Sequence, residues 1–220
     1  MPTPTLEEYL ETIYKLAQKG PVRPTQIADA IGVSGPTVTA TLRRLSAQGL
    51  TTREGNEITL TPEGLAQSID VVRRHRVAER FLVDVLGLDL HDAHEDACLL
   101  EHALSPRVME ALGRFLESPE MCPHGHPIPA SDGSVRSVSG IPLSEATTGE
   151  RYAVRQLAED DESVLSYLTS LGLTPATQLV VRNVAPFDGP LLLEISGRTS
   201  AIAREMAARV LVERESMQQG

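Results

Sequence analysis

The chain has 220 residues and a mass of 23.8 kDa, enough for one large domain or, on the usual size range, two small ones with buried cores. Apolar residues make up 41% of it and charged residues 23%, a balance that excludes a globally disordered protein. The 20 basic and 30 acidic residues give a formal net charge of −10, which argues against a protein that coats nucleic acid or an anionic membrane through bulk charge. A small, locally basic face is compatible with that total.

Membrane spans and disulfides are not expected. The apolar runs are shorter than the roughly 18 residues that a membrane span needs, and the N-terminus lacks the apolar core of a signal peptide. Cys98 and Cys122 are the only cysteines, too few for a disulfide framework. We therefore expect two free thiols, a cytoplasmic protein and no membrane partner.

The N-terminal part alternates helical patterns with short turn signals. Apolar residues recur at helical spacing over residues 6–17, and a second short helix is expected over residues 24–31. Ser34 is a typical N-cap for a third helix over residues 35–47. A small hairpin is expected over residues 51–60. Helices and a β-wing in this order predict a winged helix-turn-helix.

The rest of the chain predicts longer helices, a linker and a small mixed domain. The helices are expected over residues 61–86, 92–104 and 106–116. Their apolar surface is large enough to need a partner, which favours a helical dimer interface. Residues 118–149 are rich in Pro, Gly and Ser and are typical of a linker. Strands are then expected over residues 151–157, 179–184 and 191–195, around a helix over about 160–171.

Polar side chains interrupt the apolar stripe of the first of these longer helices. The stripe formed by Leu65, Ile69 and Val72 continues to His75 and Glu79. An imidazole and a carboxylate four residues apart on a dry face need a partner such as a metal ion. The alternative is a hydrogen-bonded pair buried in an interface.

The next predicted helix carries more metal-ligating residue types. His94, Cys98 and His102 follow one another at intervals of four residues, and Glu101 lies beside them. At about 100° per residue, Cys98, Glu101 and His102 fall within an arc of about 100°. Their thiolate, carboxylate and imidazole can converge on one metal ion when deprotonated. The alternative is a solvated face with a buried cysteine. Glu8 of the first helix could supply a further ligand.

Four segments, in this order, resemble the diphtheria toxin repressor family of iron- and manganese-dependent transcriptional repressors. They are SGPTV (34–38), HRVAER (75–80), HEDACLLEH (94–102) and CPHGHPIP (122–129). The resemblance extends over residues 1–130 and is most specific in the third segment. The last 70 or so residues look like the family's SH3-like domain.

The resemblance and the element pattern together predict a mainly α protein with small β parts. We expect a winged helix-turn-helix DNA-binding domain over residues 1–64 and a helical metal-binding and dimerisation domain over residues 65–130. A linker over residues 131–149 and an SH3-like domain over residues 150–220 complete the prediction.

The resemblance also implies two metal sites per subunit. The primary site would comprise Glu8, Cys98, Glu101 and His102. The ancillary site would comprise His75, Glu79, His94 and Asp160. The family's second ligand from the C-terminal domain, a Gln, is replaced here by Ser163.

Two departures from the family pattern bear on the choice of metal. Iron-type members carry Met at the place of Glu8, whereas manganese-type members carry Asp there and Glu at the place of Cys98. This chain combines a hard carboxylate with a soft thiolate. The predicted set therefore suits both Mn²⁺ and Fe²⁺, and Zn²⁺, Co²⁺ or Ni²⁺ would also bind in vitro.

The segment over residues 122–126 has the composition of a metal-binding loop. Cys122, His124 and His126 lie within it. The family has a Pro- and Gly-rich turn here without a ligand role, so we interpret these three residues as structural. We interpret His91, close to the start of the predicted helix, as a surface residue.

The predicted recognition helix is locally basic. From Ser34 to Arg53 there are three basic residues and no acidic one. Arg43 and Arg44 are expected to bind phosphates. Ala40, where the family has a base-reading Gln, can contact only thymine methyls, so specificity should depend more on DNA shape. The residues expected to touch DNA are Thr25, Gln26, Ser34, Pro36, Thr37, Thr39, Ala40, Arg43 and Arg44.

The sequence thus predicts a metal-dependent homodimeric regulator that represses metal-uptake genes. It would bind a pseudo-palindromic double-stranded DNA operator when loaded with Mn²⁺ or Fe²⁺. An enzyme such as a metallohydrolase is not expected, because the chain has no His-Glu-x-x-His motif. The alternative is a metal-independent winged-helix regulator, or a thiol sensor that uses Cys98.

Overall fold

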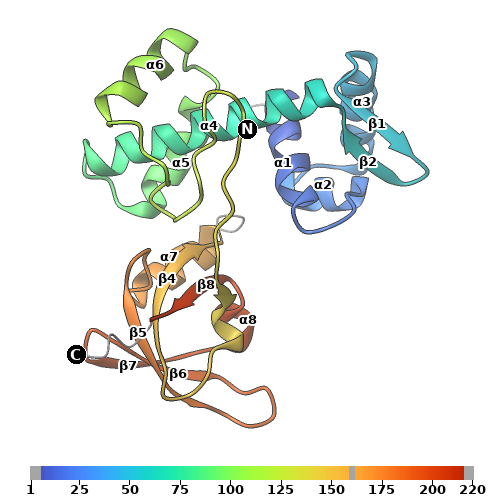
Figure 1. The fold of residues 1–220 in the computed structure, drawn as a ribbon. Coiled ribbons are helices and arrows are strands. Elements are labelled where there is room, and N and C mark those ends of the chain that lie inside the picture. Colours follow the sequence, from blue (N-terminus) through green and yellow to red (C-terminus); the bar gives the residue numbers. More distant parts are fainter. Residues whose placement is uncertain (1–5, 159–161, 216–220) are drawn as a thin grey trace.

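The computed structural model describes residues 6–158 and 162–215. An N-terminal unit and a helical unit are joined by one long helix, and a linker leads to a C-terminal domain (Figure 1). Helices dominate the first two units and a six-stranded sheet forms the C-terminal domain, which confirms the predicted class. Among the helices within these ranges, none is long and apolar enough to cross a membrane.

The N-terminal unit has the predicted winged helix-turn-helix arrangement. Its elements are α1 (Leu6–Ala17), α2 (Pro24–Ile31), α3 (Gly35–Ala47), β1 (Thr51–Glu54) and β2 (Glu57–Leu60). The side chain of Ser34 accepts a hydrogen bond from the backbone N–H of Thr37 and caps α3 as predicted. β1 and β2 pair antiparallel as the wing. Apolar side chains of the three helices and β2 share one core.

The long helix α4 (Pro62–Asp84) begins inside the N-terminal unit and extends into the helical unit (Figure 1). The hydroxyl of Ser68 donates a hydrogen bond to the carbonyl of Leu10 at 3.0 Å. Gly64 lies so close to the wing that a Cβ there would be 1.9 Å from the carbonyl oxygen of Leu50. The first turns of α4 are therefore packed tightly against the N-terminal unit. Its later turns carry His75 and Glu79, the two polar residues that interrupt the apolar stripe.

The helical unit adds α5 (Leu90–Leu100) and α6 (Pro106–Phe115) to α4. The predicted helix over residues 92–104 is wrong at both ends. Asp89 caps α5 by accepting hydrogen bonds from the next turn, so the helix begins earlier. It stops at Leu100, and residues 101–103 form a turn. Glu101 is the C-cap of α5, where it keeps helical backbone angles and its N–H donates to the carbonyl of Ala97, whereas His102 lies in the turn beyond the helix.

The C-terminal domain is an antiparallel sheet with short helices. Its elements are β3 (Ile141–Pro142), η1 (Leu143–Glu145), β4 (Arg151–Leu157), α7 (Glu162–Ser170), β5 (Gln178–Val184), β6 (Leu191–Ile195), β7 (Arg198–Ile202), α8 (Arg204–Ala207) and β8 (Val210–Arg214). The strand order is β3-β8-β4-β5-β6-β7. The three predicted strands are confirmed to within one residue, whereas β3, β7 and β8 are additional to the prediction. β7 is rich in polar residues and β3 has two residues, so neither shows a clear strand pattern.

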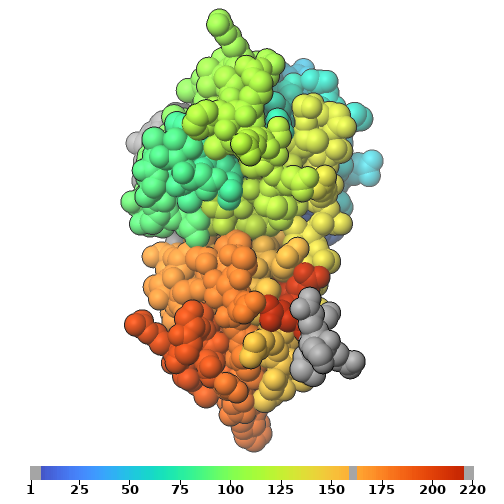
Figure 2. All heavy atoms as spheres, turned by 60° about the vertical axis from the view of Figure 1, so that its left-hand side comes forward, coloured from blue at the N-terminus to red at the C-terminus, as the bar shows by residue number. Residues whose placement is uncertain are grey.

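The C-terminal domain is in contact with the helical unit (Figure 2). The backbone N–H of Leu157 in β4 donates to the carbonyl of His124, and the ring of His126 contacts the carbonyl of Leu157 at 2.8 Å. Gly125, with a φ of +86°, brings the two backbones together, because a Cβ there would lie 2.0 Å from the carbonyl oxygen of Arg155. The loop over residues 122–128 therefore connects the C-terminal domain to the interior of the helical unit.

Candidate metal centre

His75 and Glu79 lie in the interior of the helical unit and contact one another, as the stripe on α4 predicts. They are 1% and 0% exposed. Nε2 of His75 is 2.9 Å from Oε1 of Glu79, and Nδ1 is 2.7 Å from Oε2 of Glu101. Burial lowers the pKa of His75, but the charge of Glu79 and hydrogen bonds raise it well above its usual value. A charged imidazole between carboxylates is therefore the stable form in this arrangement.

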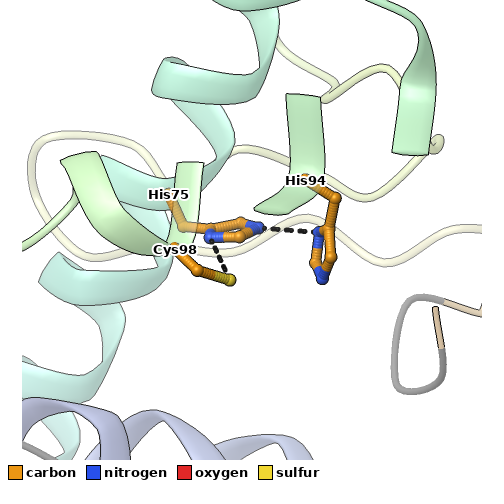
Figure 3. Close-up of side chains that lie close together, drawn as sticks. All are labelled: His75, His94 and Cys98. Atoms are coloured by element: carbon orange, nitrogen blue, oxygen red, sulfur yellow. Dashed lines mark hydrogen bonds between the residues drawn. The ribbon is translucent and has the colours of Figure 1, made fainter. Parts of the chain in front are cut away.

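α5 adds His94 and Cys98 to this pair. Nε2 of His75 lies 3.2 Å from Nδ1 of His94, and Nδ1 of His75 lies 3.9 Å from Sγ of Cys98 (Figure 3). Nδ1 of His94 is also 2.8 Å from Oε1 of Glu79. Cys98 is exposed, unlike the two histidines. The two helices thus place two nitrogens and a sulfur close together, with the sulfur on the solvent side.

His124, interpreted from the sequence as structural, also reaches this cluster. It is fully buried, and its Nδ1 lies 3.1 Å from Oε1 of Glu79. Burial raises the pKa of Glu79, but the charge of His75 and hydrogen bonds that include one from His124 hold it well below its usual value. The composition of the 122–126 segment is a signal for this contact. The interpretation of that segment as a turn without a ligand role misses it.

The residues predicted for the primary site are only partly brought together. Cys98 and Glu101 both approach Nδ1 of His75, and Nε2 of His102 lies 3.3 Å from Oε1 of Glu101. Glu8 is half-buried on α1. Among the described residues, the groups of three donors within 4.8 Å of one another include neither Glu8 nor His102. Their place in the primary site stays a prediction.

The neighbour of Glu8 makes the contact between α1 and His102. Oε2 of Glu7 lies 2.7 Å from Nδ1 of His102, and Nη2 of Arg74 donates to Oε1 of Glu7 at 2.7 Å. Burial raises the pKa of Glu7, but the hydrogen bonds from Arg74 and His102 lower it overall. Arg74 also donates to the carbonyl of Glu101 at 2.6 Å. Glu7 therefore connects the N-terminal unit to the turn that ends α5.

A second carboxylate of α1, Glu11, is buried beside the same cluster. Glu11, His75 and Glu101 form one of the groups whose donor atoms lie within 4.8 Å of one another. Burial raises the pKa of Glu101, and the charge of Glu11 adds to this while the hydrogen bond from His75 opposes it. The two carboxylates are held near each other in a dry site, an arrangement that a cation would stabilise.

The donor set fits a divalent transition metal. The donor groups are His75 with His94 and Cys98, Glu79 with His94 and His124, and Glu11 with His75 and Glu101. Oε2 of Glu79 is buried and has no hydrogen-bond partner within the described part of the chain. A buried carboxylate oxygen without a partner is costly, and a cation is one way to satisfy it. Imidazole and carboxylate suit Mn²⁺ and Fe²⁺, and the thiolate favours Fe²⁺ and later metals. Asp160, predicted for the ancillary site, lies outside the described residues.

Eight of the nine residues predicted to touch DNA are exposed in the N-terminal unit. Thr39 is half-buried, and its hydroxyl donates to the carbonyl of Gly35 at 3.0 Å. The side-chain oxygen of Gln26 accepts a hydrogen bond from the backbone N–H of Arg23, which fixes the start of α2. The exposed members of the predicted set are Thr25, Gln26, Ser34, Pro36, Thr37, Ala40, Arg43 and Arg44.

Comparison with known proteins covers nearly the whole chain. Residues 1–57 match the family described as iron dependent repressor, N-terminal DNA binding domain. Residues 61–130 match its metal binding and dimerisation domain, and residues 141–214 match the FeoA domain.

The relatives and solved structures agree with these matches. The iron-dependent repressor IdeR of Mycobacterium leprae is 36% identical, over 96% of this chain and 97% of the relative. The diphtheria toxin repressor of Corynebacterium diphtheriae is 30% identical, over 95% and 96%. The structure of a manganese-dependent transcriptional repressor in complex with manganese has a TM-score of 0.86 and 32% identity, and the match covers 96% of this chain and all of that one. These proteins are repressors and not enzymes. The chain therefore belongs to the iron-dependent repressor family, which includes the diphtheria toxin repressor.

Proposed function

We propose that this protein is a homodimeric transcriptional repressor of metal-uptake genes in the cytoplasm, whose operator binding depends on Mn²⁺ or Fe²⁺. The observation that carries the proposal is the buried donor cluster around Glu79, with a carboxylate oxygen that lacks a hydrogen-bond partner among the described residues. His75 and Glu79 of the cluster belong to α4, and the first turns of the same helix are packed into the N-terminal unit. Metal binding and the placement of the recognition helix therefore involve one element.

The proposal includes two metal sites per subunit. The primary site would comprise Glu8, Cys98, Glu101 and His102. The ancillary site would comprise His75, Glu79, His94 and Asp160, to which we add His124 on the ground of its contact with Glu79. A bound divalent cation would supply the positive charge that His75 otherwise provides among these carboxylates.

The carboxylates of α1 suggest how the sites would act on DNA binding. Glu7 contacts His102 directly, and Glu11 is buried beside His75 and Glu101. These contacts lie between the N-terminal unit and the helical unit. If the α1 carboxylates help to hold a cation, the metal-loaded protein favours one orientation of the two units. The gain in operator affinity equals the difference in metal affinity between that orientation and the others.

The helical unit offers a surface for a second subunit. Several of its large apolar side chains are exposed, and they are Val85, Leu86, Leu99, Leu100, Val108 and Phe115. Pairing through this unit would place two recognition helices about 34 Å apart on a pseudo-palindromic operator. Within the proposal, residues 1–64 bind DNA, 65–130 bind metal and dimerise, 131–149 are the linker and 150–220 are the SH3-like domain.

Operator binding by purified protein under anaerobic conditions tests this function. We expect Mn²⁺ or Fe²⁺ to raise operator affinity by about 10- to 100-fold over the chelated protein, the usual range of allosteric coupling. Electrophoretic mobility shift over a protein titration measures the effect. Equal operator affinity with metal and with chelator would contradict the proposal. Release by peroxide, unaffected by chelator, would support the thiol sensor that uses Cys98.

Substitution of His124 tests the ancillary site separately. We expect His124→Ala to weaken the binding of one of two Mn²⁺ ions at least about tenfold, because the variant removes a nitrogen donor beside Glu79. Isothermal titration calorimetry with Mn²⁺ measures both sites. His91→Ala is the matched control, because His91 is paired at 3.8 Å with Glu95 on the outer side of α5. Unchanged affinity at both sites in His124→Ala would show that His124 is structural.

A further inference from the structure

Three side chains form a connected set of contacts between α1, α4 and the turn that ends α5. Glu7 of α1 lies at the centre of this set, with its Oε2 2.7 Å from Nδ1 of His102. Arg74 of α4 donates to both oxygens of Glu7, through Nη2 at 2.7 Å and through Nη1 at 3.3 Å. Two bonds from one guanidinium to one carboxylate fix the orientation of both groups. The Glu7 carboxylate is therefore held in one place against the ring of His102.

Further contacts hold Arg74 itself. Its side chain is buried, and its Nε donates to Oδ2 of Asp70, one turn earlier on α4, at 3.1 Å. Its Nη1 also donates to the carbonyl of Glu101 at 2.6 Å. Glu101 directly precedes His102 in the chain. Arg74 thus contacts both the backbone of the turn and the carboxylate that faces the histidine of the same turn.

The two ring nitrogens of His102 face different carboxylates. Nδ1 lies 2.7 Å from Oε2 of Glu7, whereas Nε2 lies 3.3 Å from Oε1 of Glu101. A carboxylate at 2.7 Å accepts a hydrogen bond, so Nδ1 carries a proton. The lone pair of the neutral ring is then on Nε2, on the side of Glu101. Glu101 and His102 are both among the ligands proposed for the primary metal site.

We infer that Glu7 and Arg74 are positioning residues of the primary metal site, and that neither is a metal ligand. This inference rests on the proposed function, because it takes His102 as a ligand of that site. A histidine that binds a metal through one ring nitrogen almost always donates its other N–H to a carboxylate, a carbonyl or a water, which fixes the tautomer and the orientation of the ring. Glu7 has this relation to His102, and Arg74 orients the Glu7 carboxylate.

This arrangement connects the primary site to the N-terminal unit through one hydrogen bond. The Nδ1–H of His102 becomes a stronger donor when Nε2 is bound to a cation. The bond from His102 to Glu7 is therefore stronger in the metal-loaded protein. Because Glu7 belongs to α1, the loaded protein favours the orientation of the two units in which this bond is formed. The adjacent glutamates of α1 then have different roles, Glu8 as a proposed ligand and Glu7 as the residue that orients another ligand.

Nuclear magnetic resonance of the metal-free protein tests the tautomer of His102. In alkaline buffer, where the ring is neutral, we expect a long-range proton–nitrogen correlation spectrum to show the proton on Nδ1. The variant His102→Gln identifies the signals of this ring among the six histidines. In Glu7→Ala we expect the proton to move to Nε2, because the acceptor beside Nδ1 is removed. A proton on Nε2 in the unmodified protein, or one and the same tautomer in both proteins, would overturn the inference.

Isothermal titration calorimetry with Mn²⁺ distinguishes a positioning residue from a ligand. We expect Glu7→Ala to weaken one of two sites about 10- to 100-fold, the usual range for groups that orient a ligating histidine. Glu7→Gln should lose less than about tenfold, because its amide oxygen still accepts a hydrogen bond from Nδ1. A carboxylate that is itself a ligand would not be replaced by an amide in this way. Equal losses in Glu7→Gln and Glu7→Ala would therefore overturn the positioning role.

The matched controls are Glu150→Ala and Glu150→Gln in the C-terminal domain. The side chain of Glu150 is 35% exposed, compared with 39% for Glu7, and it also accepts two hydrogen bonds from one arginine, Arg214. Both controls should keep the Mn²⁺ affinity and the His102 tautomer of the unmodified protein. If the unmodified protein does not respond to metal, the proposed function fails. If it responds and Glu7→Ala binds Mn²⁺ equally tightly, only the positioning role fails.

Discussion

Replacement of His75 by alanine is expected to abolish the metal response of operator binding. His75 takes part in two of the three donor groups, with His94 and Cys98 and with Glu11 and Glu101. Its removal takes a nitrogen donor from the centre of the cluster. We expect at least about a 100-fold loss of metal affinity, and operator affinity with Mn²⁺ or Fe²⁺ should fall to that of the chelated protein.

Stability must be measured beside binding, because the same variant leaves buried carboxylates without their partner. Loss of one member of a buried pair typically costs about 3–5 kcal/mol, and His75 lies between Glu79 and Glu101. Urea unfolding of the metal-free variant therefore accompanies the operator measurement. His91→Ala should leave metal affinity, operator affinity and the unfolding midpoint unchanged. A folded His75→Ala protein that still responds fully to metal would remove His75 from the metal sites.

The double variant Arg43→Ala/Arg44→Ala is expected to lose operator binding while it keeps its metal affinity. Both arginines are exposed on α3, in a stretch without acidic residues. Each of two subunits would then bind two fewer phosphates, which should reduce the slope of log affinity against log salt by about 3–4. We expect operator affinity to fall at least about 100-fold at physiological salt.

Fluorescence anisotropy with labelled operator at several salt concentrations measures both effects. Arg182→Ala/Arg214→Ala, with the same change in charge on the C-terminal sheet, should leave affinity and slope unchanged. Retained affinity with an unchanged salt slope in Arg43→Ala/Arg44→Ala would show that α3 does not face the phosphates. A similar loss in the control would indicate an effect of total charge instead of a local contact.

The secondary structure of the first two units is well predicted from the sequence, because capping residues mark the helix starts. Ser34 and Thr61 both accept the capping hydrogen bonds that their positions suggest. The end of α5 is harder to predict, because its apolar and ligand-type residues continue at helical spacing past Leu100. Helix ends without a glycine or proline signal are poorly marked in a sequence.

The residue types of the metal-binding region can be predicted from the sequence better than the contacts between its side chains. The contacts of His75 with Glu79 and His94 follow from helical spacing and from the packing of α5 on α4. The contact of His124 with Glu79 depends on a loop whose course is set by Gly125 and by the C-terminal domain. A loop has no repeating pattern of residues from which this contact could be predicted. The contact of Glu7 with His102 depends on how α1 is turned against α4. Adjacent glutamates cannot be told apart by residue type.

Because α4 is one continuous helix, a movement at its metal-binding end is transmitted to the N-terminal unit. The helix is fixed near Gly64 by contact with the backbone of Leu50, just before the wing, and His75 lies eleven positions further along. At 1.5 Å per residue the two points are about 16 Å apart. A tilt of α4 by a few degrees at the histidine would therefore move the recognition helix by about 1 Å. That distance separates a formed hydrogen bond from a broken one, so a small adjustment among buried ligands is sufficient to change how the protein fits the DNA groove.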